Sequence, residues 1–269
     1  MIALTWTEPD TDTRRSLADL PGTTLETVLG QAALQTRIDR KYLLDDDELP
    51  AVLSGVEGTL AVLRIDGHQG FGYQSTYFDT PRRDAYRRAG QGRRRRFKVR
   101  TRVYRDSGEA WLEVKTRGPR NTTVKDRLLY ELSHAGRLTP VARAFAEQTL
   151  SARGVDGVDV ASLAPTLHTG YVRTTLLLTG GAAASRATVD TGLVWRRPGS
   201  ALALALPHQV IVETKGGSAP SPLDRALWRA GVRPSRISKY GAGLAALDDD
   251  LPSLKWHRLL NQELNPTTA

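Results

Sequence analysis

Hydrophobic and polar residues alternate along much of the chain, a pattern typical of β-strands whose two faces meet different surroundings. The alternation predicts nine strands, over residues 35–44, 60–65, 73–79, 93–104, 110–116, 124–132, 166–178, 186–195 and 208–214. Helix-start signals and helical periodicity predict shorter helices over residues 25–34, 45–53, 138–153, 241–247 and 251–264, with one more starting at Ser221-Pro222. We therefore expect an α+β protein with a mostly antiparallel sheet of eight or nine strands and peripheral helices.

The domain organisation follows from the same pattern. Residues 1–22 are polar, contain Pro9 and Pro21, and predict a flexible N-terminal arm. No linker rich in Pro, Gly or Ser divides the remainder. We expect a single domain over residues 23–264.

Positive charge is concentrated on one face of the strand predicted over residues 93–104. Residues two apart on a strand share a face, and this face carries Arg94, Arg96, Lys98, Arg100 and Arg102. The opposite face carries Phe97, Val99 and Thr101 and resembles a stretch of core. The strand is therefore cationic on one side only.

Charged rows recur on other predicted strands, several with a carboxylate among the cations. These rows are Arg37, Asp39 and Lys41; Trp111, Glu113 and Lys115; Lys125 and Arg127; Arg186 and Asp190; and Glu213 and Lys215. A sheet with one solvated face could carry such rows. Six strands of this kind favour a shared polar interior instead, with helices over the apolar outer faces, which inverts the usual small barrel.

An enclosed row of like charges requires a counter-charge. Neighbouring cations on one face are ~7 Å apart and repel by roughly 2 kcal/mol at an effective dielectric constant of ~20. An anion with a charge every few ångströms, such as a triphosphate or inorganic polyphosphate, relieves this best, whereas a nucleic acid duplex is too wide for a tunnel. The interspersed carboxylates then suggest a divalent cation such as Mg²⁺ or Mn²⁺.

Composition narrows the function classes further. The net charge of +9 and the pI near 10.0 point to an anionic partner but do not choose among nucleic acid, lipid and phosphate. The absence of cysteine excludes disulfides, cysteine-ligated metals and thiol nucleophiles. No apolar stretch approaches the roughly 20 residues that cross a bilayer, and the N-terminus lacks the apolar core of a signal peptide. We expect a cytoplasmic protein without a transmembrane segment of its own.

Eight short motifs resemble those of the VTC domain, the polyphosphate polymerase domain of the CYTH-like triphosphate tunnel metalloenzyme superfamily. They occur in the family's order between about residues 35 and 245. They are Arg37-Ile-Asp-Arg-Lys-Tyr42, Thr76-Tyr-Phe-Asp-Thr80, Phe97-Lys-Val-Arg-Thr-Arg-Val-Tyr104, Trp111-Leu-Glu-Val-Lys115, Tyr171-Val-Arg173, Arg186-Ala-Thr-Val-Asp190, Val212-Glu-Thr-Lys215 and Ser238-Lys-Tyr240.

The resemblance implies a tunnel-shaped barrel and a reaction. Members transfer the γ-phosphoryl group of ATP to a growing polyphosphate chain, with Mn²⁺ or Mg²⁺ as the metal. The implied partners are ATP and polyphosphate, with a membrane protein needed for any coupled export and no nucleic acid.

The resemblance also assigns residues. The expected phosphate-binding residues, with Arg94 and Arg96 added from the cationic row, are Lys41, Arg94, Arg96, Lys115, Lys125, Arg127, Arg173, Arg186 and Lys215. Those expected to serve catalysis are Lys98, Arg100, Arg102, Glu213 and Lys239. Glu213 is the first candidate metal ligand, with Glu113 and Asp190 as further candidates.

Several alternatives remain open. The superfamily's hydrolases carry Glu-x-Glu-x-Lys on the first strand, where this chain has Arg37-Ile-Asp39-Arg-Lys41, which favours the polymerase branch. A metal-dependent triphosphatase or a non-catalytic polyphosphate-binding module would use the same interior. Each candidate carboxylate could instead be an ion-pair partner of neighbouring arginines. Trp111 could stack on a guanidinium or a base, or fill one end of the barrel. Asp79 is expected to cap a turn.

Overall fold

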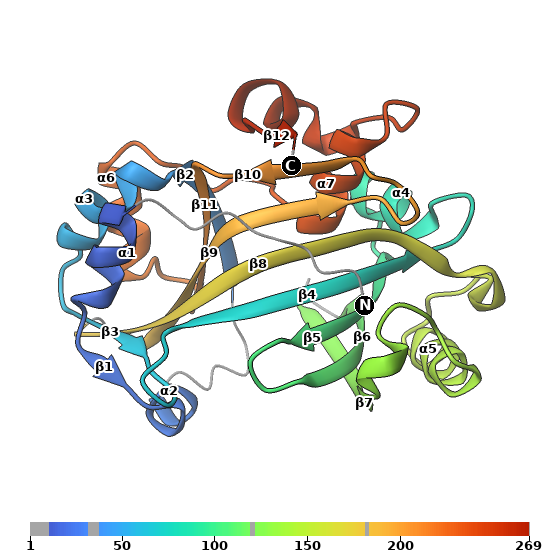
Figure 1. Ribbon diagram of the computed structural model, residues 1–269, viewed down its shortest axis with the longest axis horizontal. Coiled ribbons are helices and arrows are strands. Elements are labelled where there is room, and N and C mark those ends of the chain that lie inside the picture. The colour runs from blue at the N-terminus through green and yellow to red at the C-terminus, as the bar shows by residue number, and fades with distance from the viewer. Residues whose placement is uncertain (1–10, 32–37, 119–121, 181–182, 269) are drawn as a thin grey trace.

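The computed structural model describes residues 11–31, 38–118, 122–180 and 183–268, and it shows an α+β protein built on one large antiparallel sheet (Figure 1). The strands are β1 (Gly22–Thr23), β2 (Ile38–Asp45), β3 (Thr59–Leu63), β4 (Gly70–Asp79), β5 (Phe97–Tyr104), β6 (Glu109–Arg117), β7 (Thr123–Tyr130), β8 (Ala164–Thr179), β9 (Ser185–Arg196), β10 (Ala203–Leu206), β11 (Gln209–Gly216) and β12 (Thr267–Thr268). The α+β class and the antiparallel sheet predicted from the sequence are confirmed.

Strand pairing follows the order β2, β11, β9, β8, β4, β5, β6 and β7, and every step is antiparallel. β10 and β12 extend the sheet beside β9, and β3 with its parallel neighbour β1 extends it beside β8. β2 and β11 rise steeply against the long strands β4 and β8, so the sheet curls (Figure 1). Pairing of β2 with β7, which would complete a barrel, is not found within the described ranges.

Short helices surround the sheet (Figure 1). They are α1 (Thr11–Ala18), α2 (Leu25–Gln31), α3 (Leu49–Ser54), α4 (Asp84–Gly90), α5 (Pro140–Ala152), α6 (Pro222–Arg229) and α7 (Lys239–Leu247). Tight helical turns are found at Asp46–Glu48, Leu132–His134, Val160–Ser162 and Leu254–Trp256, with a π-helical turn at Leu259–Glu263. None of the helices that the structure describes is long and apolar enough to cross a bilayer.

The apolar faces of the strands point outward and pack against these helices. Val99 and Leu112 are buried in one cluster with residues of α4, α5 and α7. Val189 and Val212 are buried in a second cluster with residues of α3 and α6. Because successive residues of a strand point to opposite faces, this packing turns the charged rows inward. The inverted arrangement predicted from the alternation is therefore present.

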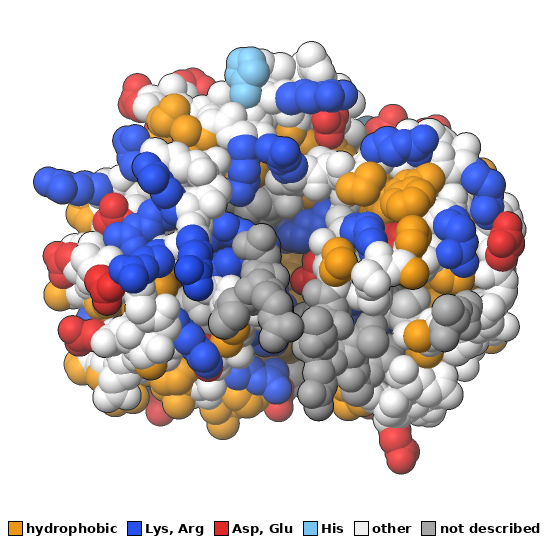
Figure 2. All heavy atoms as spheres, turned by 180° about the vertical axis from the view of Figure 1, so that it is seen from behind, with side chains coloured by type: hydrophobic (Ala, Val, Ile, Leu, Met, Phe, Trp, Pro, Cys, Tyr) orange, Lys and Arg blue, Asp and Glu red, His pale blue; other side chains and the backbone are white. Residues whose placement is uncertain are grey.

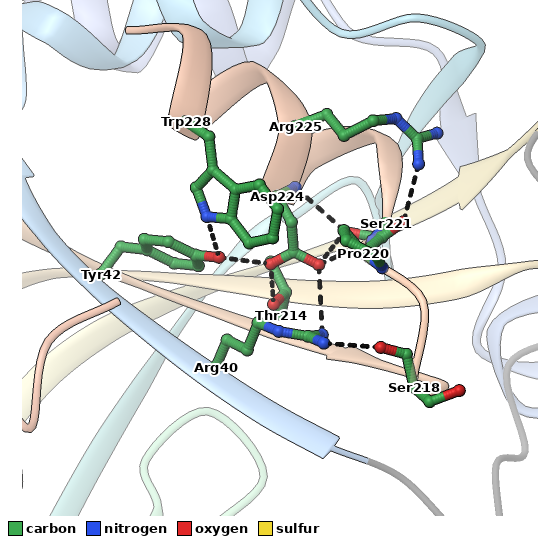
Figure 3. Close-up of polar contacts among 9 residues, drawn as sticks. All are labelled: Arg40, Tyr42, Thr214, Ser218, Pro220, Ser221, Asp224, Arg225 and Trp228. Atoms are coloured by element: carbon green, nitrogen blue, oxygen red, sulfur yellow. Dashed lines mark hydrogen bonds and ion pairs between the residues drawn. The ribbon is translucent and has the colours of Figure 1, made fainter. Parts of the chain in front are cut away.

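Asp224 at the start of α6 fastens the outer sides of β2 and β11 together (Figure 3). Its carboxylate accepts hydrogen bonds at 2.6 Å from the hydroxyls of both Tyr42 on β2 and Thr214 on β11. It also accepts from the backbone N and the hydroxyl of Ser221 at 2.7 and 2.8 Å, and Arg40 lies 3.5 Å away. One carboxylate thus fixes α6 to both strands. Among the described residues, β2 pairs with β11 alone, so this contact secures the edge of the sheet.

The main departures from the predicted elements lie in the arginine-rich segment from Arg82 to Arg96. The strand predicted from residue 93 begins at Phe97, and part of the preceding segment forms α4. Asp79, expected to cap a turn, accepts backbone hydrogen bonds from Thr80 and from Ala85 and Tyr86 in the first turn of this helix. The run from 91 to 96 contains no hydrophobic residue to bury, so the strand starts at the first one.

Part of the segment expected to be a flexible arm is folded. Residues 11–18 form α1, with Leu17 buried in the same cluster as Leu49 and Val52. The hydroxyl of Thr13 donates a hydrogen bond to the carbonyl of Asp46. Two inward-facing residues in a short polar helix give little periodicity, which is why the sequence pattern did not reveal this helix. The first ten residues lie outside the described part of the chain.

Candidate functional site

A cavity of about 540 Å³ lies in the hollow of the curled sheet. Its lining contains two carboxylates, Asp39 and Glu213, among the described residues. The lining cations are Lys41, Arg96, Lys98, Arg100, Arg102, Lys115, Arg117, Lys125, Arg173, Arg186, Lys215 and Lys239. Lys and Arg side chains gather around the hollow in the middle of the face drawn in Figure 2. The cavity therefore has the charge of a polyanion site.

Three lysines lie directly across from one another on neighbouring strands of the cavity wall. Lys98 on β5 pairs with Lys115 on β6, and Lys115 pairs with Lys125 on β7. Like charges in such positions destabilise a sheet, so this lysine row favours a bound anion. Burial, and then the nearby cations, hold the pKa of Lys98 and that of Lys115 well below their usual value. Lys98 donates a hydrogen bond to the hydroxyl of Ser238 at 3.0 Å.

Glu113 on β6 is fully buried and lies in the cross-strand row next to the lysine row, between Arg100 on β5 and Arg127 on β7. Its Oε2 accepts hydrogen bonds from Nε and Nη2 of Arg100 at 2.8 and 2.6 Å, and its Oε1 lies 3.5 Å from Lys125. Burial alone would raise the pKa of Glu113, but Arg100, Arg102 and further cations hold it far below its usual range. Glu113 is therefore ionised and already paired with Arg100, which favours an ion-pair role over metal binding.

Asp190 plays the same part on β9. Arg173 on β8, its direct cross-strand neighbour, donates to its two oxygens at 2.6 and 2.7 Å, and Lys239 also donates to it. Arg173 and Lys239 oppose the effect of burial and lower the pKa of Asp190. Lys239 is the first residue of α7, so the ion pair ties this helix to the cavity wall.

Glu213 is the carboxylate of the three candidates that lines the cavity. Its Oε1 lies 3.1 Å from Nζ of Lys215, and its direct neighbours across the sheet are Lys41 and Thr188. Burial is outweighed by Lys215 and Lys41, which hold the pKa of Glu213 well below its usual range. An ionised carboxylate facing the cavity suits a divalent cation, since Mg²⁺ is typically held by one or two carboxylates plus phosphate oxygens. No group of three potential metal ligands occurs within the described ranges.

The structure brings most of the predicted residues together but leaves some outside the cavity lining. Arg94 is exposed in the turn before β5, because the strand starts at Phe97. Arg127 lies on the inward side of β7, but its guanidinium is stacked over the Trp111 ring, with 4.6 Å from Cζ to the ring centroid. Neither is a cavity residue. Arg37 lies outside the described residues.

Tyrosines form a part of the lining that the sequence reasoning did not assign. Tyr73, Tyr77 and Tyr171 line the cavity, and Tyr73 stacks on Tyr171 with their centroids 5.4 Å apart. Arg102 and Arg173 each lie 5.3 Å from the centroid of the Tyr73 ring. The alternate spacing of Tyr73 and Tyr77 was the available signal. These rings hold the guanidinium groups in place without neutralising them.

The chain matches the family model described as "VTC domain" over residues 36–248, and it belongs to this family. A search of curated proteins finds no match. Among solved structures, a candidate adenylyl cyclase from Hippeastrum with a dominant triphosphatase activity is 14% identical, with a TM-score of 0.45, over 81% of this chain and 99% of that chain. A candidate adenylate cyclase from Vibrio parahaemolyticus is 15% identical, with a TM-score of 0.36, over 83% and 89% of the two chains. A conserved hypothetical protein from Pyrococcus furiosus is 11% identical, with a TM-score of 0.38, over 76% and 99%.

Proposed function

We propose that the protein is a polyphosphate polymerase, which transfers the γ-phosphoryl group of ATP to the end of an inorganic polyphosphate chain. The observation that carries the proposal is the cavity lining of the VTC domain, with twelve cations against two carboxylates in the described residues. The lysine row of Lys98, Lys115 and Lys125 suits a phosphate anion, because it gathers three like charges at one level of the cavity wall.

Phosphoryl transfer depends on alignment and charge neutralisation more than on a protein nucleophile. A terminal oxygen of the acceptor chain attacks the γ-phosphorus, the bond from that phosphorus to the β,γ-bridging oxygen breaks, and ADP leaves. The attacking oxygen is already ionised at neutral pH, so no protein base is required. Arg100 and Arg102 on β5 supply fixed positive charge to the oxygens of the transferred group, and Arg173 on β8 and Lys239 at the start of α7 add to it.

We propose a Mn²⁺ or Mg²⁺ site at Glu213. Glu113 and Asp190 support an ion-pair role instead, since both are already held by arginine. Glu213 would hold the metal, which would supply positive charge against the phosphate oxygens. Glu213→Gln should abolish metal-dependent turnover and leave polyphosphate affinity unchanged or stronger. Unchanged turnover would remove Glu213 from the metal site.

A metal-dependent triphosphatase is the second candidate, and the position of Glu213 favours keeping it. An ionised carboxylate that faces the cavity could orient an attacking water, which the polymerase does not need. The two reactions share substrate and site but differ in products. Purified protein with ATP and Mn²⁺ should yield ADP and polymer as a polymerase, ADP and free phosphate as a triphosphatase, and neither as a polyphosphate-binding module.

We further expect the protein to work in the cytoplasm, where ATP is available, and a membrane-protein partner would be needed for export of the polymer. Nucleic acid is not an expected partner. Tripolyphosphate should displace any bound RNA or DNA at equal charge concentration, because the lining offers cations in rows and few groups that could read bases. Binding that resists tripolyphosphate would contradict this expectation.

A further inference from the structure

The two ends of the cavity differ in chemical character. At the end where β4 starts and β5 finishes, Tyr73 pairs with Tyr104, and the two rings lie 5.0 Å apart edge to face. We call this the aromatic end. Trp111 on β6 lies beside it, outside the lining, as the cross-strand neighbour of the lining residue Arg102. The opposite end, where β5 starts and β6 finishes, carries Arg96 and Arg117. We call it the cationic end.

The Trp111 side chain has two polar contacts beside the aromatic end. Its indole Nε1 donates a hydrogen bond to Glu109 at 3.4 Å, and the guanidinium of Arg127 lies over its ring at 4.6 Å. Leu129, directly across from Trp111 on β7, is 64% exposed. Trp111 itself is half-buried, on the same inward side of β6 as Glu113 and Lys115. A Trp–Arg stack beside an exposed leucine is a surface on which a planar, partly apolar group can lie.

This stack lies next to the phosphate-binding part of the cavity. Trp111 is the direct cross-strand neighbour of Arg102, which lines the cavity. Glu113, which anchors Arg100, is two residues further along β6, or ~7 Å at the usual strand rise. A ribose spans a similar distance between a phosphate and a base. A nucleotide with its phosphates on Arg100 and Arg102 therefore has its base at the level of Trp111.

We infer that the nucleoside of the donor nucleotide binds at the aromatic end, with its base stacked on the Trp111–Arg127 pair. The inference rests on the proposed function and adds to it a base-binding subsite and a direction. A nucleotide has an aromatic base at one end and anionic phosphates at the other. Of the two ends of the cavity, the aromatic end suits the base. Bases stack favourably both on aromatic side chains and on arginine guanidinium planes.

The direction of the phosphates follows. Phosphates that extend from the aromatic end pass the Arg100–Glu113 row and reach Lys98 and Lys115, beyond which lie Arg96 and Arg117. Burial, and then Arg117, lower the pKa of Arg96. The acceptor chain then occupies the cationic end, and its terminal phosphate meets the γ-phosphate between the two.

Paired ligands with and without a base test the inference. We would measure the affinity of the intact protein for ATP and for tripolyphosphate by calorimetry, without turnover, after replacing Mn²⁺ by Ca²⁺. Trp111→Leu removes the π surface and keeps the apolar bulk, so it should weaken ATP binding by about tenfold and change tripolyphosphate binding by less than about twofold. Trp111→Phe should restore most of the ATP affinity. Arg96→Ala is the matched variant at the cationic end and should weaken binding of both ligands.

Equal effects of Trp111→Leu on both ligands, or no effect on either, would overturn the inference. Thermal unfolding of Trp111→Leu verifies that the variant is folded, and Leu129→Ala, at a mostly exposed position, gives a milder change at the same surface. Selective loss of ATP affinity in a protein that forms no polymer would support the base subsite and reject the polymerase reaction. Polymer formation by the wild type, together with equal losses of ATP and tripolyphosphate affinity in Trp111→Leu, would support the polymerase reaction and reject the base subsite.

Discussion

Arg100 donates two hydrogen bonds, from Nε and Nη2, to the same oxygen of Glu113, at 2.8 and 2.6 Å. Both side chains are almost fully buried, at 9% and 0% exposed. The pair fixes the guanidinium within the wall, where its Nη1 also donates to the hydroxyl of Tyr77 at 2.9 Å. Glu113 thus organises the cations around it and lets them remain inside the fold before a phosphate arrives.

Glu113→Gln should lower the free energy of unfolding by about 3 kcal/mol, because it leaves buried arginine and lysine charges without their partner. Urea denaturation measures the loss, and saturating tripolyphosphate should recover part of it by binding the folded state. Glu109→Gln, at an exposed position of the same strand, is the control and should change stability little. Equal stability of the two variants would show that Glu113 does not compensate the cluster.

Lys115→Met should make the ligand-free protein more stable and a poorer binder. Lys115 lies between Lys98 and Lys125, so its removal relieves repulsion in the lysine row. We expect a higher melting temperature and a loss of tripolyphosphate affinity of at least about tenfold, which corresponds to one buried charge-assisted contact. Arg95→Gln removes the same charge from an exposed site and should change neither. Unaltered affinity in Lys115→Met would place the phosphates elsewhere.

Triphosphate binding should weaken as the pH rises above about 8, where Lys255, whose ammonium group donates a hydrogen bond to the carbonyl of the lining residue Ala89, begins to lose its proton. Burial, then Arg96, Arg236 and Lys41, lower the pKa of Lys255 to about 8. A bound polyanion raises this pKa again, so above pH 8 binding takes up a proton at Lys255. Calorimetry at pH 8.5 in two buffers of different ionisation enthalpy measures the uptake.

Lys255→Met serves as the comparison, because it removes this titrating group. The variant should therefore take up fewer protons than the wild type when tripolyphosphate binds. The protons of tripolyphosphate itself contribute equally to both proteins. Identical proton uptake by the variant and the wild type would contradict the assignment.

Asp224→Asn should cost about 2–3 kcal/mol of stability, because an amide cannot accept all the hydrogen bonds that the carboxylate accepts from Tyr42, Thr214 and Ser221. Tyr42→Phe removes one donor and should cost about 1 kcal/mol. Chemical denaturation measures both losses. Asp249→Asn, at an exposed position, is the matched control. A loss in Asp224→Asn no larger than that of the control would mean that the carboxylate does not fasten α6 to the sheet.

Strand alternation predicted which side chains face the interior, because the two-residue period is a local property of the strand. It placed Lys98, Arg100 and Arg102 in the cavity, and it placed Arg127 on the correct side of its strand. It could not predict the height of a residue along the cavity, which depends on register between strands. Nor could it predict that β7 ends the described strand order, so that Arg127, paired across from Glu113 and expected among the phosphates, is exposed and stacks on Trp111 instead.

Register also explains what the sequence left open about the carboxylates. Asp190 and Arg173 are 17 residues apart, and only the pairing of β8 with β9 makes them direct neighbours. The segment before Phe97 shows a different limit. Its arginines continued the cationic alternation, but strand formation there also needs apolar residues for the outer cluster. Arg94 has none beside it in the sequence.

Product analysis with γ-labelled ATP tests the central claim most directly. Purified protein is incubated with the nucleotide and Mn²⁺, and the label is followed into long-chain polymer and into free phosphate while ADP is measured. The proposed polymerase predicts that label in the polymer rises in step with ADP and that an exopolyphosphatase releases it. Label that appears as free phosphate in step with ADP, with no polymer at any time, would contradict the polymerase and leave a triphosphatase.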